Sequence, residues 1–102
     1  MAFASARSRR DDRELAASPG ISPSDLVALA ARADRSTKAI IAARVDCPLA
    51  TMIAFAMDHD ATVHAALLDN PALPPTVLEQ LARSRNGKVR AGAQARLGSA
   101  AA

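Results

Sequence analysis

The sequence predicts an all-α fold, a short α-solenoid of about three and a half two-helix repeats with a 26-residue period. Apolar positions recur at this spacing, as in Leu26, Met52 and Leu78 (52 − 26 = 78 − 52 = 26). Prolines and helix-capping residues follow the same spacing, and the chain is rich in alanine, which favours helix over strand. A fixed period of about 20 to 50 residues is typical of solenoids, in which each unit buries its apolar face on the next.

The chain has 102 residues and a net charge of +3, which is enough sequence for one domain. We expect a disordered basic arm at residues 1–8 and a disordered tail at residues 99–102. The repeat domain between them, residues 9–98, divides into a half-repeat at 9–17 and repeats at 18–43, 44–69 and 70–97.

Within each repeat, proline and the apolar spacing predict a first helix, over residues 23–33, 49–57 and 75–84. A second, shorter helix follows, capped by Asp34, Asp60 and Asn86 in turn. The shared position of Leu29, Phe55 and Leu81 predicts a continuous buried row through the three repeats.

The two ends of the stack are expected to differ. Leu15 lies 26 residues before Ile41, so residues 9–17 are predicted to be an unpaired second helix that covers the first repeat. Gly98 is expected to end the last helix. The alanine-rich helix before it leaves the other end of the stack open, and we expect a second copy of the chain or another protein to dock there.

Three stretches resemble a known family: Leu15 to Pro23, Leu67 to Leu78, and Asn86 to Ala91. They are similar to the leucine-rich repeat variant family, a bacterial repeat family in the style of HEAT repeats. The resemblance covers about residues 12–97 and is weakest in the middle repeat, which lacks the Asn-Pro pair. It implies a right-handed superhelix of paired helices and a scaffold role with no activity common to the family. The iron–sulfur cluster of some members lies on a cysteine-rich segment that has no counterpart here.

Asp58, His59, Asp60 and His64 form the one cluster with metal-ligand residue types. Asp60 is explained as a helix cap, however, and the two histidines are five residues apart (64 − 59), off the i, i+4 spacing that places two ligands on one helix face. No metal site is therefore predicted.

The single cysteine, Cys47, takes the position of Ile21 and Leu73 and is expected to be a small buried hydrophobe. No catalytic constellation or phosphate-binding loop is present, so the sequence predicts neither an enzyme nor a cofactor. A lone cysteine is typical of the reducing cytoplasm. No segment has the roughly 20 apolar residues of a membrane span or the apolar core of a secretory signal. We therefore expect a cytoplasmic protein without membrane contact.

Lys38, His64 and Arg90 share one position and lie next to the capping residues in each repeat. The favoured interpretation is that each cation pairs with an acid of the adjacent repeat; the alternative is an exposed recognition stripe. Together with three cations near the start of the last helix, they make the candidate interaction surface: Lys38, His64, Arg90, Arg83, Arg85 and Lys88.

The charge runs basic, acidic, basic along the chain, and residues 45–82 carry five acids and no lysine or arginine. Arg7, Arg9 and Arg10 form a candidate basic arm that could grip an acidic surface or a nucleic acid. The first functional hypothesis is a non-catalytic protein–protein interaction module. The alternative is a nucleic-acid-associated protein that binds the phosphate backbone through the arm and the basic last repeat, although the acidic middle interrupts such a track.

Overall fold

The computed structural model describes residues 6–101, with side-chain surroundings for residues 9–99, and this part of the chain is all-α. Its helices are α1 (Ala6–Ala17), α2 (Pro23–Arg32), α3 (Arg35–Ala42), α4 (Leu49–Met57), α5 (Ala61–Leu68), α6 (Pro75–Leu81) and α7 (Gly87–Ala101). No strand occurs among the described residues, so the predicted all-α class is confirmed.

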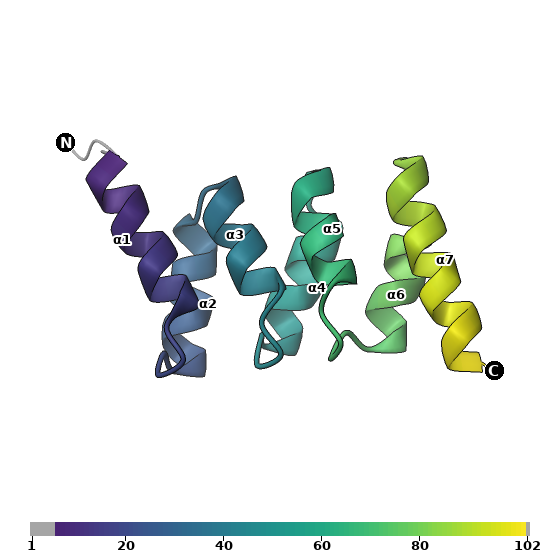
Figure 1. Ribbon diagram of the computed structural model, residues 1–102, viewed down its shortest axis with the longest axis horizontal. Helices are drawn as coiled ribbons and strands as arrows, with labels where there is room; N and C mark the ends of the chain where they lie inside the picture. Colours follow the sequence, from purple (N-terminus) through teal and green to yellow (C-terminus); the bar gives the residue numbers. More distant parts are fainter. Residues whose placement is uncertain (1–5, 102) are drawn as a thin grey trace.

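The helices follow one another in chain order along the longest dimension of a molecule that measures 48 × 27 × 17 Å (Figure 1). One layer holds α1, α3, α5 and α7, and the other holds α2, α4 and α6. Helix α3 packs between α1 and α5, α5 packs on α7, and α4 packs on α6. The first and last helices therefore lie at opposite ends of the molecule.

The predicted capping residues begin the second helix of each 26-residue unit. Side-chain oxygens of Asp34, Asp60 and Asn86 accept backbone N–H groups two or three residues further on, at 2.9, 2.8 and 3.0 Å. In the first unit, Ser22 caps α2 by accepting the N–H of Asp25 at 3.1 Å. These bonds satisfy donors that the first turn of a helix leaves unpaired.

The core follows the predicted apolar positions. Leu29, Phe55 and Leu81 are buried, with 1%, 4% and 1% of their surface exposed, so their predicted burial is confirmed. Each of these residues lies on the first helix of its unit. The aliphatic residues Ile41 and Leu67 on the second helices are fully buried as well.

At the N-terminal end, the expected disordered arm is wrong for residues 6–8, which form the first turns of α1 together with Arg9 and Arg10. Residues 1–5 lie outside the described part of the chain. Leu15 also departs from its expected role, because it is 42% exposed while the neighbouring Ala16 is buried. Helix α1 packs on α3 and α2, and neither of them covers the side chain of Leu15.

At the C-terminal end, residues 99–101 belong to α7 and are not the disordered tail that the sequence predicts. Gly98 lies inside this helix and does not cap it, since no described glycine has a positive φ. The sequence after Gly98 is rich in alanine, which has the highest helix propensity. A single glycine costs a helix only about 1 kcal/mol, so the helix continues past Gly98.

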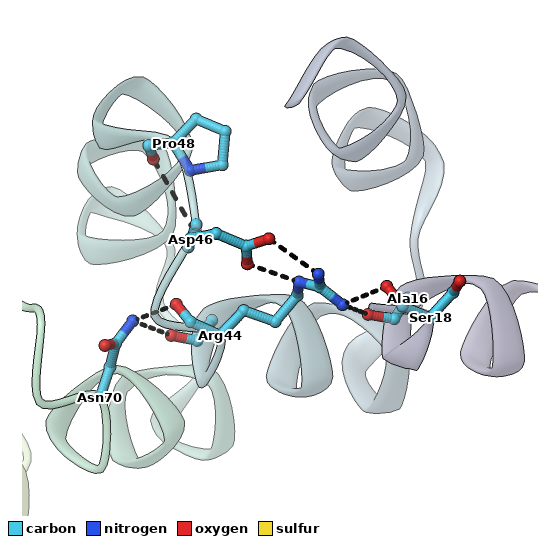
Figure 2. Close-up of polar contacts among 8 residues, drawn as sticks. Ala16, Ser18, Arg44, Asp46, Pro48 and Asn70 are labelled. Atoms are coloured by element: carbon cyan, nitrogen blue, oxygen red, sulfur yellow. Dashed lines mark hydrogen bonds and ion pairs between the residues drawn. The ribbon is translucent and has the colours of Figure 1, made fainter. Parts of the chain in front are cut away.

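Each unit is tied to the preceding one by a side chain that reaches back to the end of the preceding second helix. Arg44 Nη1 donates to the carbonyl oxygens of Ala16 and Ser18, both at 2.8 Å (Figure 2). Its other guanidinium nitrogens, Nε and Nη2, bind the two carboxylate oxygens of Asp46 at 2.7 and 2.8 Å.

The same contact recurs at the equivalent positions of the next two units. Asn70 Nδ2 donates to the carbonyls of Ala42 and Arg44 at 2.9 and 2.6 Å. Arg96 Nη1 donates to those of Leu68 and Asn70 at 2.8 and 2.9 Å. Donor and acceptors are 28 and 26 residues apart in all three cases. We call Arg44, Asn70 and Arg96 the inter-unit clamp.

One core position carries a poorly partnered polar group. Thr37 is fully buried, and its Oγ1 makes no hydrogen bond of good geometry among the described residues, although it lies near enough to the Asp34 carboxylate to help lower the pKa of that group. The equivalent positions hold Val63 and Val89 (37 + 26 = 63; 63 + 26 = 89). We expect Thr37→Val to raise the free energy of unfolding by about 1 kcal/mol, since it removes a buried hydroxyl whose one polar neighbour, the Asp34 carboxylate, still accepts the backbone N–H of residue 37. Urea melts should show this, whereas Thr62→Val at an exposed position should change stability by less than about 0.5 kcal/mol. A destabilised Thr37→Val would contradict this account.

Candidate functional site

Lys38, His64 and Arg90 do not form one exposed stripe. His64 is 7% exposed, and its Nε2 donates to the carbonyl oxygen of Phe55 at 3.1 Å. Arg90 is exposed and donates to the carbonyl oxygen of Ser84 at 2.9 Å. A continuous recognition stripe is therefore broken at its middle residue.

The first junction, between the units of α3 and α5, is bridged by two ion pairs. Lys38 Nζ lies 3.0 Å from Asp58 Oδ2, and Arg35 Nε lies 2.6 Å from Asp60 Oδ2. The hydrogen bond from Lys38 holds the pKa of Asp58 below its ordinary value. Lys38 thus pairs with an acid of the next unit, as the favoured interpretation has it, but its partner is Asp58 and not the capping residue Asp60.

The second junction, between the units of α5 and α7, lacks these ion pairs. The four equivalent positions, 26 residues further on, hold Ala61, His64, Ser84 and Asn86. An open groove of about 870 Å³ lies here, lined by these four residues together with Ala56, Met57, Asp58, His59, Gln80, Leu81, Arg83 and Arg85. The positions equivalent to the ion-paired residues thus hold no lysine, arginine, aspartate or glutamate at the second junction. Smaller hollows, of about 390 and 420 Å³, lie beside the ion pairs at the first junction.

Arg83 and Arg85 bring positive charge to this groove. Both are exposed, and neither makes an ion pair within the described residues. The remaining predicted interaction residue, Lys88, is exposed at the start of α7. Of the six predicted surface residues, the groove brings together only His64, Arg83 and Arg85.

The layer of α2, α4 and α6 carries large apolar side chains that face away from the core. Leu49, Ile53 and Met57 are 54%, 46% and 67% exposed and lie at i, i+4 and i+8 along α4. Val27 of α2, in the position of Ile53, is 48% exposed. We call these four residues the apolar face. Sequence reasoning missed them, although the signal exists: α4 is apolar on every side, which exceeds what one packed stripe needs.

A pocket of about 210 Å³ opens between α4 and α6 beside the apolar face. It is lined by Ile53, Ala56, Met57, Thr76, Val77 and Gln80, with no charged residue among them. Three of these residues, Ala56, Met57 and Gln80, also line the groove at the second junction. The pocket and the groove are therefore neighbours on one surface.

The predicted basic arm lies far from the groove. Arg9 and Arg10 are exposed on α1, and Arg7 belongs to the same helix, with its side chain outside the described set. Helix α1 is at the opposite end of the molecule from α7 (Figure 1). The two basic regions are thus separated along the 48 Å dimension.

Cys47 is buried, as predicted, and its Sγ lies 3.8 Å from the carbonyl oxygen of Pro48. Burial raises the pKa of the thiol to about 11. The thiol is therefore protonated at neutral pH, which is unfavourable for a nucleophile. In the described part of the chain, no group of three or more His, Cys, Asp or Glu side chains could hold a metal ion.

Comparisons of the chain with protein-family models, curated proteins and solved structures give no match. The resemblance to the leucine-rich repeat variant family therefore stays a prediction that rests on the sequence stretches quoted for it. Of the helices described, none combines the length and apolar character needed to cross a bilayer.

The ion pairs predict how stability depends on pH. Pairing with Arg44 lowers the pKa of Asp46, and pairing with Lys38 lowers that of Asp58. The unfolded chain has ordinary values of about 3.9, so these pairs stabilise the fold above about pH 4. Their contribution is lost as the pH falls through the lower pKa values of the folded state. Urea midpoints measured from pH 7 to pH 2 should fall more gently for Asp46→Asn with Asp58→Asn than for the unchanged chain. Equal slopes would contradict the assignment.

Proposed function

We propose that the chain is a short right-handed α-solenoid of the leucine-rich repeat variant type and acts as a non-catalytic protein–protein interaction module in the cytoplasm. The observation that carries this proposal is the apolar face, Val27, Leu49, Ile53 and Met57. Soluble proteins rarely leave large apolar side chains grouped on one surface, and such groups mark interaction sites. The single cysteine, a buried thiol, fits a reducing compartment.

The surroundings of the apolar face also fit a protein partner. Helix α4 carries no charged residue, while the equivalent positions of the next unit hold Glu79 on α6 and Arg83 just after it (53 + 26 = 79; 57 + 26 = 83). An apolar centre beside a charged margin is the usual arrangement of a protein interface. Neighbouring helices in one layer also give a partner a preformed surface, which lowers the entropic cost of binding.

The test is partner capture with matched variants. Immobilised wild type, Ile53→Asp and Val45→Asp are incubated with lysate, cross-linked and analysed by quantitative mass spectrometry. Val45 is 66% exposed in the turn before α4, outside the apolar face, so it is the control. We expect proteins that wild type and Val45→Asp retain and Ile53→Asp loses, with all three equally helical by circular dichroism. Identical capture by Ile53→Asp and wild type would count against the proposal.

The alternative, binding of a nucleic acid, is favoured by one observation: Arg83 and Arg85 are exposed cations without an ion pair among the described residues. Labelled duplex and single-stranded oligonucleotides at 50 and 200 mM salt separate the two functions. Submicromolar binding that weakens by orders of magnitude over this range would support the alternative.

Self-association through the exposed alanine-rich side of α7 is a further part of the proposal. Light scattering over a concentration series, repeated at high salt, measures it directly. A constant monomer mass would leave this end of the stack to a different protein.

A further inference from the structure

We propose that the groove at the second junction and the pocket between α4 and α6 together bind an acidic amphipathic segment of another protein. A large aliphatic or aromatic side chain of that segment enters the pocket, and its carboxylates meet Arg83 and Arg85. This inference rests on the proposed function, because it names the chemistry of the partner.

The two junctions differ in the side chains at their equivalent positions. At the first junction, the chain supplies both cations and both acids, and the side chains meet at 3.0 and 2.6 Å. At the second, none of the four equivalent positions holds a lysine, arginine, aspartate or glutamate, and all four line the groove. The cations there come instead from the segment after α6, at positions 83 and 85. The acids that would complete this junction have to come from outside the chain.

The lining of the groove carries more positive than negative side chains. Its lining holds two arginines and one carboxylate, Asp58. That carboxylate is already bound by Lys38, so it does not neutralise the arginines. The two histidines of the lining, His59 and His64, add no negative charge. A carboxylate-bearing ligand therefore meets complementary charge.

The neighbouring pocket offers space for an apolar side chain. At about 210 Å³ and without a charged lining residue, it is larger than apolar cavities of about 150 Å³ that bind benzene. A leucine, methionine or phenylalanine side chain fits such a space. Because the pocket and the groove share Met57, one short segment can fill the pocket and reach the arginines. A phosphate backbone has no side chain for the pocket, which favours a peptide over a nucleic acid.

The experiment selects ligands from a phage-displayed library of random 16-residue peptides against the full chain. Enriched peptides should carry a large apolar residue within one or two helical turns of glutamate or aspartate. The best binder is then synthesised with a fluorescent label, and its affinity is measured by anisotropy. Arg83→Glu with Arg85→Glu should weaken binding about tenfold or more, because attraction becomes repulsion.

A second variant fills the groove without touching the arginines. Ala61→Arg with Asn86→Asp rebuilds the counterpart of the Arg35–Asp60 pair across the groove, and aspartate can still cap α7 as Asp34 and Asp60 cap their helices. It should weaken peptide binding while the denaturant midpoint stays unchanged. Lys88→Glu and Val45→Ser, at exposed positions outside the groove lining, should bind as wild type does.

The inference would be overturned by enrichment of basic peptides, by no enrichment at all, or by unchanged affinity in both groove variants. Loss of binding in Leu49→Asp with unchanged binding in Arg83→Glu and Arg85→Glu would leave the proposed function standing and reject the acidic partner, because Leu49 lies on the apolar face and lines neither the pocket nor the groove. An oligonucleotide that displaces the peptide at physiological salt would reject it as well.

Discussion

Phe55→Ala is expected to lower the free energy of unfolding by about 3–5 kcal/mol, the cost of deleting a large buried aromatic side chain. Phe55 is 4% exposed and lies in the middle unit, in the row with Leu29 and Leu81. It is the one aromatic residue within the described part of the chain, since Phe3 falls outside it. No other core side chain of that part is as large, so no neighbour can refill the space.

Denaturant melts followed by circular dichroism measure this loss. A domain of this size has a total stability of about 5–15 kcal/mol or less, so the alanine variant could be unfolded without denaturant. Phe55→Leu, a smaller truncation, then gives a measurable loss in the same direction. Met57→Ala is the control on the same helix, because Met57 is 67% exposed and its removal leaves no cavity. Wild-type stability in Phe55→Ala would mean that the core is built differently.

Asn70→Ala is expected to lower the free energy of unfolding by about 2–4 kcal/mol, because it leaves several buried polar groups without partners. Asn70 is fully buried; its Nδ2 holds two carbonyls and its Oδ1 accepts the N–H of Ala72 at 2.8 Å. Asn70→Asp should be worse than alanine, since a carboxylate would face two carbonyl oxygens at the distances that Nδ2 now occupies. Urea melts of both variants test the order.

The other members of the inter-unit clamp provide the matched variant. Asn70→Arg should recover part of the loss, because Arg44 and Arg96 make the same pair of bonds from equivalent positions. Asn86→Ala, which removes an exposed helix cap, should cost only about 1 kcal/mol. If Asn70→Ala and Asn86→Ala lowered the free energy of unfolding by the same amount, the clamp would contribute no more to stability than an exposed helix cap.

The core and the caps could be predicted because their physical requirements repeat with the sequence. An apolar residue at positions 29, 55 and 81 meets the same need in each unit, and so does a short polar side chain at 34, 60 and 86. The helix starts could be predicted for the same reason, but α6 ends at Leu81, three residues before its predicted end at residue 84. The end of α7 was not, because the continuing run of small residues past Gly98 offers no strong stop signal.

The clamp and the groove depend on three-dimensional reach, which residue types alone do not reveal. Arg44, Asn70 and Arg96 differ in size and charge, and their shared property is a pair of N–H groups that can reach two carbonyls. Arginine thereby takes the place of asparagine in the middle repeat, where the Asn-Pro pair is absent. His64 shares its position with two cations, yet it is buried, and its Nε2 donates to the carbonyl oxygen of Phe55.

The clamp also fixes the order in which its acceptor and donor groups appear during synthesis. Every donor lies 26 and 28 residues after the carbonyls that it holds, so during synthesis the acceptors emerge first. At about 5–20 residues per second, the delay is on the order of one to six seconds. An isolated helix of eight residues is marginal in water, but it forms in roughly a microsecond, so each second helix can form and unfold many times before its clamp arrives. Each unit therefore leaves the ribosome together with the donor side chain that ties it to the preceding unit.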